Sequence, residues 1–164
     1  MISLVRVDDR LVHGMVAVSW TSALKPDCIL VANDAASKDA FMSMTMKMAK
    51  PAGVSLIIKT IEESIGILNS EKYKSKKFFV VTESVEDAYK VSEQVNGIKT
   101  VNIGTAGIKK KEKLISTLPQ IKMSIEDFEY ARKLHEKGID VFAQVTPSLE
   151  RMNYEGILKA FHTI

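Results

Sequence analysis

Ile2-Ser3-Leu4-Val5-Arg6-Val7 is a nearly continuous aliphatic run, and the polar string Asp8-Asp9-Arg10-Leu11-Val12-His13-Gly14 follows it directly. Apolar side chains at successive positions are typical of strands in a parallel sheet that helices cover on both faces. Five later runs share this pattern, at residues 28–32, 54–59, 78–82, 100–103 and 139–145. The first run therefore predicts a strand of a parallel sheet, and the later runs predict the other strands.

Helix signals lie between the predicted strands. Three segments begin with a hydroxyl side chain that can cap a helix, and an apolar stripe at helical spacing follows each: Thr60, Ser84 and Ser124. Two further helices are expected, one from Ser37 to a stop at Pro51 and one over residues 149–161. Because strands and helices alternate, we expect an α/β fold: an open, mostly parallel, doubly wound sheet of about six or seven strands with helices on both faces.

Length and composition limit the class of protein. The chain has 164 residues, of which 46% are hydrophobic and 26% charged, and this is typical of one globular domain over residues 1–164. No apolar run approaches the roughly 20 residues of a membrane-spanning helix. The single cysteine, Cys28, excludes an internal disulfide and fits a reducing compartment. These features favour a cytoplasmic protein.

The net charge of +3 is a small surplus. The densest basic run, Lys109-Lys110-Lys111-Glu112-Lys113, contains no aromatic side chain on which a nucleic-acid base could stack. The run favours a solvated face, with a docking patch for an acidic partner as the alternative. Nucleic acid is therefore not an expected partner.

Ligands of open α/β sheets bind beyond the carboxyl ends of the strands, and residues 8–14 are the richest such end. His13 precedes an apolar segment with the features of a helix, whose positive end disfavours the imidazolium form and leaves a nucleophilic ring nitrogen. The helix-start amides and Arg10 could hold a phosphate on the ring, and Asp9 could orient the imidazole or Arg10. Three further candidates for phosphate binding also follow strands: Gly14, Thr82 and Ser84.

A loop histidine beside a local Asp–Arg ion pair is the competing interpretation, and residue types alone favour neither. His135, among charged residues, and His162, near the end of the chain, are weaker candidates. The sequence has no G-x-G-x-x-G motif after a strand, no P-loop and no His or Cys pair at metal-ligand spacing, so it predicts neither a cofactor nor a metal. A receiver domain is excluded, because the third strand ends in Lys59 where that module has its phosphorylated aspartate.

The string Val5-Arg6-Val7-Asp8-Asp9-Arg10-Leu11-Val12-His13-Gly14, followed by Trp20, resembles the opening of a known family. That family is the IIB components of the mannose/fructose/sorbose class of the bacterial sugar phosphotransferase system, which also includes N-acetylgalactosamine systems. The likeness continues in order through five later stretches, at residues 31–34, 48–54, 82–88, 101–104 and 124–138. It therefore covers nearly the whole chain.

The resemblance implies a protein-Nπ-phosphohistidine–sugar phosphotransferase. Such a subunit lies in the cytoplasm at the membrane transporter, takes a phosphoryl group from a IIA partner and transfers it to a sugar during import through IIC and IID. The phosphorylated residue of the family maps onto His13, at the Nδ1 atom. Arg10 maps onto the arginine that supports the phosphoryl group, and Asp9 maps onto an acid of the motif.

Two departures from the family pattern leave an alternative open. Met15 stands where the family usually has glutamine, and Gly104-Thr105-Ala106 stands where it usually has Gly-Gly-Met. A non-catalytic regulatory or binding domain of the same fold is therefore the alternative function. The sequence does not specify the sugar or the oligomeric state, although an apolar face on the terminal helix would permit a homodimer.

Overall fold

A computed structural model describes residues 1–106, 109 and 112–163, apart from the side chain of Met15. Its main feature is a seven-stranded sheet in the order β3-β2-β4-β1-β5-β8-β9. All neighbouring strands run parallel except β9, which pairs antiparallel with β8. The strands are β1 (Ile2–Asp8), β2 (Cys28–Ala32), β3 (Ser55–Lys59), β4 (Phe78–Thr82), β5 (Thr100–Thr105), β8 (Asp140–Ala143) and β9 (Met152–Asn153). The expected α/β fold is confirmed.

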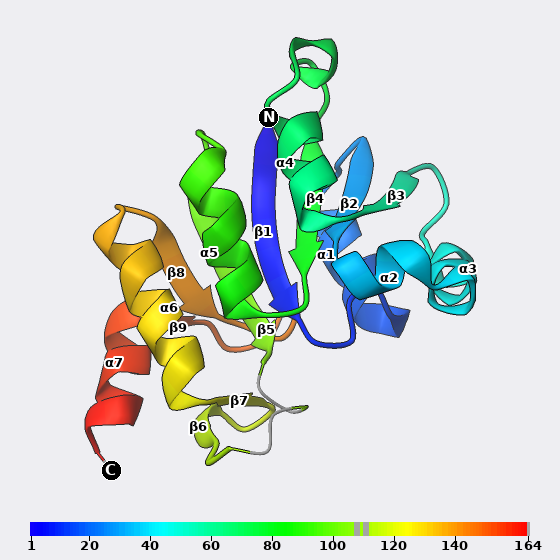
Figure 1. The fold of residues 1–164 in the computed structure, drawn as a ribbon. Helices are drawn as coiled ribbons and strands as arrows, with labels where there is room; N and C mark the ends of the chain where they lie inside the picture. Colours follow the sequence, from blue (N-terminus) through cyan, green and yellow to red (C-terminus); the bar gives the residue numbers. More distant parts are fainter. Residues whose placement is uncertain (107–108, 110–111, 164) are drawn as a thin grey trace.

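Helices cover both faces of this sheet (Figure 1). They are α1 (Gly14–Leu24), α2 (Asp34–Lys38), α3 (Ala40–Ala49), α4 (Ile61–Leu68), α5 (Val85–Gln94), α6 (Ile125–Glu136) and α7 (Tyr154–His162), with a 3-10 turn at Glu71–Tyr73. A separate hairpin joins β6 (Ile115–Leu118) to β7 (Ile121–Met123). Among the described residues, no helix is long and apolar enough to cross a membrane.

Alternate side chains of β1 enter two different cores. Val5 and Val7 belong to the larger cluster, which includes side chains of α5, α6 and α7. Leu4 belongs to the smaller cluster, which includes side chains of α1 and α3. Because side chains of a strand alternate between its faces, Arg6 and Asp8 lie on the same face as Leu4, toward α1. Two charged residues of β1 are thereby directed into the layer that contains α1.

The prediction that a helix begins at Ser37 was wrong. Ser37 lies inside α2, which Asn33 caps by accepting a hydrogen bond from the Ala36 N–H. A second helix, the methionine-rich α3, follows α2, and Asp39 caps it by accepting a hydrogen bond from the Met42 N–H. Its methionines do not all fill the core: Met46 is 4% exposed, whereas Met48 is 82% exposed.

The helix expected over residues 149–161 begins later than predicted. Met152 and Asn153 instead form the edge strand β9, and Asn153 caps α7 by accepting from the Gly156 N–H. Ile157 and Phe161 of α7 are buried in the larger core. The apolar face of the terminal helix is therefore used within the chain and gives no reason to expect a homodimer.

Candidate functional site

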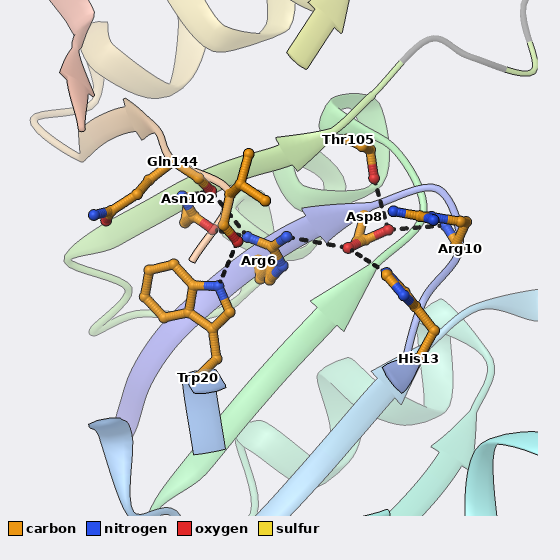
Figure 2. Close-up of polar contacts among 9 residues, drawn as sticks. Arg6, Asp8, Arg10, His13, Trp20, Asn102, Thr105 and Gln144 are labelled. Atoms are coloured by element: carbon orange, nitrogen blue, oxygen red, sulfur yellow. Dashed lines mark hydrogen bonds and ion pairs between the residues drawn. The ribbon is translucent and has the colours of Figure 1, made fainter. Parts of the chain in front are cut away.

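Asp8, the last residue of β1, is the centre of a polar cluster at the carboxyl end of the sheet (Figure 2). Its Oδ2 atom lies 3.1 Å from a guanidinium nitrogen of Arg6 and 3.0 Å from Nε2 of His13. Its Oδ1 atom accepts hydrogen bonds from the Thr105 hydroxyl at 2.7 Å and from the Arg10 N–H at 3.0 Å. A carboxylate has about four acceptor positions, and all of them are used here.

The turn after β1 brings His13 back over Asp8. The N–H of Leu11 donates to the Asp8 carbonyl at 2.9 Å, and Leu11 has a φ of 59°, a left-handed conformation that costs free energy for a leucine. The side chains of Leu11 and Val12 are buried in the smaller core and hold this turn in place. Gly14 has a φ of 43° and begins α1. The imidazole is thus positioned by a strained turn that the core holds in place.

His13 stands at the N-cap position of α1, but its side chain makes no capping hydrogen bond. The side chain is 25% exposed and contacts Asp8 through Nε2. When Asp8 is ionised it can only accept, so a neutral imidazole must carry its proton on Nε2. The lone pair of the neutral ring is therefore on Nδ1, the nitrogen nearer the backbone.

The contacts of the Asp8 carboxyl favour its ionised form. Burial alone would raise the pKa of its carboxyl, but the Arg6 guanidinium, the Thr105 hydroxyl and the Arg10 N–H outweigh burial and lower that pKa below its ordinary value. A charged Asp8 beneath the ring favours positive charge on the imidazole whenever a group is added at Nδ1. The geometry therefore suits a histidine that carries an electrophilic group.

Arg6 is the buried cation of the cluster. Its guanidinium donates to Oδ1 of Asn102 in β5 and, at 3.1 Å, to the carbonyl of Gln144 beyond β8. The guanidinium carbon lies 5.5 Å from the ring centroid of Trp20 in α1, close enough for a cation–π contact. A Cβ on Gly104 would overlap the Arg6 guanidinium, so glycine at this position in β5 allows the guanidinium to lie where it does.

Arg10 and Asp9, the other two charged candidates, lie in the same turn. The Arg10 guanidinium is exposed and has no hydrogen-bonding partner among the described residues. Asp9 is buried, and its N–H donates to the Thr105 carbonyl at 3.0 Å. The carboxylate that contacts the imidazole at Nε2 is Asp8, whereas the role expected for Asp9, orienting the imidazole or Arg10, stays a prediction. Sequence reasoning missed Asp8, although its spacing of two from Arg6 in a strand was a signal.

Thr82 and Ser84 already have structural partners. The Thr82 hydroxyl donates to the Ser84 carbonyl at 3.1 Å, and the Ser84 hydroxyl caps α5 by accepting from the Asp87 N–H. These contacts do not favour a role for either side chain in phosphate binding. In contrast, Thr105, part of the departure from the family pattern at residues 104–106, donates its hydroxyl to the centre of the cluster.

Near the site, Glu83 connects Asn33 to Lys109, and a cavity lies apart from His13. Glu83, after β4, accepts from the Asn33 amide at 2.7 Å and lies 3.1 Å from Nζ of Lys109, while Lys110 and Lys111 of the basic run are outside the described residues. A cavity of about 670 Å³ lies beside α2, α4 and α5, and its lining does not include His13. The described residues contain no group of three or more His, Cys, Asp or Glu side chains that could hold a metal.

The fold and the site define a doubly wound α/β protein with a carboxylate-held histidine at the carboxyl edge of its sheet. The family model described as the PTS system sorbose subfamily IIB component matches residues 2–163. The chain therefore belongs to the sorbose-subfamily IIB components of the sugar phosphotransferase system. It is a phosphotransfer component of such a system.

Individual relatives agree with this assignment. A probable phosphotransferase enzyme IIB component of Streptococcus pyogenes serotype M6 is 39% identical over 152 residues, which are 90% of this chain and 93% of the relative. An N-acetylgalactosamine-specific IIB component of Escherichia coli K12 is 29% identical over 147 residues, 89% of this chain and 91% of that protein. The IIB domain of the Klebsiella pneumoniae sorbose permease has the same fold, with a TM-score of 0.89 at 23% identity and 97% of each chain covered.

Proposed function

We propose that this chain is a phosphocarrier in which Nδ1 of His13 accepts a phosphoryl group and then transfers it to a sugar. The donor in this proposal is a phosphohistidine on a IIA partner. The sugar receives the group during import through membrane subunits of the IIC and IID type. The chain would act in the cytoplasm at that transporter, with residues 1–164 as one IIB domain. The observation that carries the proposal is the Nε2 contact with Asp8, because it leaves the Nδ1 lone pair for the reaction.

In the first transfer, the Nδ1 lone pair of His13 attacks phosphorus and a new N–P bond forms. The N–P bond of the donor breaks, and its electron pair returns to the donor imidazole. The phosphorylated ring keeps its proton on Nε2 and becomes positively charged, and the Asp8 carboxylate, 3.0 Å from Nε2, stabilises that charge. No nucleotide is consumed, because the N–P bond of the donor phosphohistidine supplies the phosphoryl group.

In the second transfer, a sugar hydroxyl attacks phosphorus and the bond from phosphorus to Nδ1 breaks. The electron pair of that bond returns to Nδ1, and the hydroxyl proton goes to solvent. The positive ring of phosphohistidine is a good leaving group, which suits a carrier that must release what it accepts. The histidine is therefore restored in the tautomer in which it began.

The phosphoryl oxygens would be held by Arg10 and by the start of α1. The exposed Arg10 guanidinium can form a two-point contact with them. The first turn of α1 contains no acidic residue, and its free N–H groups favour an anion. Gly14 stays in this proposed phosphate site as the first residue of that turn. Thr82 and Ser84 are left out of it because both hydroxyls are engaged elsewhere.

The test is the intact mass of the protein at alkaline pH, after incubation with phosphoenolpyruvate, the general phosphotransferase proteins and a IIA partner of this class. We expect one added phosphate that is lost in mild acid and is absent from His13→Ala. His135→Ala is the matched control, because His135 stacks on Tyr154 away from the cluster, and it should accept phosphate normally. If the protein accepts no phosphate from a donor that phosphorylates another IIB component, the alternative of a non-catalytic regulator replaces the proposal.

A further inference from the structure

Arg6 is a buried charge that no step of the proposed transfer uses directly. The residue is 2% exposed, and its contacts come from β1, β5, α1 and the segment after β8. Burying a guanidinium is costly unless it is paired and hydrogen-bonded, and a methionine or leucine would fill the same space without that cost. The chain also provides Gly104, on which no Cβ obstructs the guanidinium. Packing alone does not explain why the fold buries a charged side chain here and surrounds it with these contacts.

Arg6 and His13 share one oxygen atom. Oδ2 of Asp8 lies 3.1 Å from Arg6 and 3.0 Å from His13. With a neutral imidazole, the positive charge of Arg6 and the negative charge of Asp8 balance. Protonating the free imidazole would place a second positive charge against the same oxygen, and the like charge of Arg6 opposes this. A phosphoryl group added at Nδ1 brings its own negative charges, which offset the positive charge of the ring, so the phosphorylated ring meets a smaller penalty than the protonated free ring.

The other charged groups around the cluster do not replace Arg6. Asp9 and Arg10 belong to the same turn, and Glu83, after β4, is paired with Lys109. The remaining contacts of the cluster are uncharged and come from three elements: Asn102 and Thr105 of β5, Trp20 of α1 and Gln144 beyond β8. Among the described residues, two side chains with basic groups contact the Asp8 carboxylate: Arg6, which carries a fixed positive charge, and the imidazole of His13.

We propose that Arg6 is a positioning residue for phosphoryl transfer, whose fixed charge holds Asp8 beneath the imidazole and keeps free His13 in the neutral form that is nucleophilic at Nδ1. This inference rests on the proposed function of His13. It adds that Arg6 influences how well His13 accepts phosphate. Arg6 acts through the Asp8 carboxylate and does not contact the phosphoryl group.

The test compares Arg6→Met with Arg6→Lys by two measurements: the NMR titration of the His13 ring and the pH dependence of phosphate acceptance. In Arg6→Met we expect the titration midpoint of His13 to rise by about one pH unit or more. The acidic limb of the acceptance rate should move with it, so that acceptance at acidic pH becomes about tenfold slower for each pH unit by which the midpoint rises. Arg6→Lys keeps the charge and should stay close to the wild-type midpoint. A purely structural role would lower the unfolding temperature and leave both pH profiles in place.

The matched control is Arg132→Met, which removes an exposed arginine paired with Glu129 and Glu136 on α6 and should move neither profile. If Arg6→Met does not fold, Asn102→Ala replaces it, because that change keeps the arginine but removes the acceptor of one guanidinium nitrogen. A smaller shift in the same direction is then expected. An unchanged or lowered His13 midpoint in the folded variant overturns the inference. Because the phosphate test on His13→Ala is independent, failure of the proposed function is told apart from failure of this inference.

Discussion

The carboxyl end of β1 and the carboxyl ends of β2, β3 and β4 lie at the same edge of one sheet but use their polar side chains differently (Figure 1). After β2, β3 and β4, side chains complete helix starts: Asn33 caps α2, Thr60 caps α4 and Ser84 caps α5. After β1, the His13 side chain caps nothing and is held at Nε2 alone. Of these four side chains, that of His13 is therefore the one that does not complete a helix start.

A search for the functional site by cavity size would have pointed to the region after β2, β3 and β4 instead of the end of β1. The cavity of about 670 Å³ is lined by residues of the β2–β4 side, among them Asp34, Thr60 and Asp87. Asp34 accepts from the Ile61 N–H at 2.9 Å, and Thr60 and Glu63 satisfy each other in a capping box. These groups hold helices in place and leave little chemistry available. The comparison teaches that the candidate site is better located by asking which polar groups lack a structural task.

The largest expected effect comes from changing one carboxylate in each region to its amide. In Asp8→Asn, the new amide can donate to Nε2 of His13, which moves the ring proton to Nδ1, and Arg6 loses its counter-charge. We expect the rate of phosphate acceptance to fall by about 10²- to 10⁴-fold. In Asp34→Asn, the amide oxygen can still accept from Ile61, so the rate should not change. Single-turnover mass spectrometry measures both, and equal rates in the two variants would remove Asp8 from the mechanism.

A second comparison uses two glycines. In Gly104→Ala, the new Cβ would overlap the guanidinium of Arg6, which is held by Asp8, Asn102 and the Gln144 carbonyl and cannot swing away freely. We expect a loss of about 1–3 kcal/mol in the free energy of unfolding, together with slower phosphate acceptance.

The control for this change is Gly66→Ala in α4, where a Cβ would meet nothing within 4 Å. That variant should gain about 0.5–1 kcal/mol, because alanine favours a helix over glycine. Urea unfolding of both variants measures the difference. If Gly104→Ala is as stable as the wild-type protein, the close contact with Arg6 does not constrain the site.

Much of the fold could be predicted from the sequence because buried parallel strands are apolar at successive positions. The strands at residues 28–32 and 78–82 were predicted with their observed bounds, and Ser124 begins α6 as expected. The short hairpin of β6 and β7 and the two-residue strand β9 were not predicted, because their runs are too short to show a period. Their existence depends on contacts between segments rather than on local pattern.

The candidate site was predicted in part. His13 was singled out because it precedes an apolar helix, and the structure places its ring against Asp8. The roles expected for His13 and Arg10 in phosphate transfer stay predictions. Asp9 was named as the acid beside the imidazole, where the structure has Asp8. The difference depends on where β1 ends: the strand includes Asp8, whose side chain therefore lies on the same face as that of Arg6. The roles of Asn102 and Gln144 arise only when three strands are assembled.

The smallest expected effect compares the acid stability of two carboxylates, Asp8 at the end of β1 and Asp87 beside the large cavity. Arg6 and the hydrogen bonds of Asp8 outweigh its burial and lower its pKa, whereas burial raises the pKa of Asp87 despite Lys90. A lowered folded-state pKa stabilises the fold above the unfolded-state pKa of about 4, and this stability is lost as the pH falls through the folded-state value. A raised folded-state pKa has the opposite sign, so stability is gained as the pH falls from the folded-state value toward about 4.

Between about pH 6 and about pH 3, the free energy of unfolding of Asp8→Asn should therefore fall less than that of the wild-type protein. That of Asp87→Asn should fall more, because the variant lacks the compensating proton uptake. Urea unfolding at several pH values measures the two slopes, and the comparison uses only the change with pH, so a general loss of stability in either variant does not affect it. Slopes that deviate from wild type in the same direction would contradict the assignment of Asp8 as the carboxylate that the fold holds in its charged form.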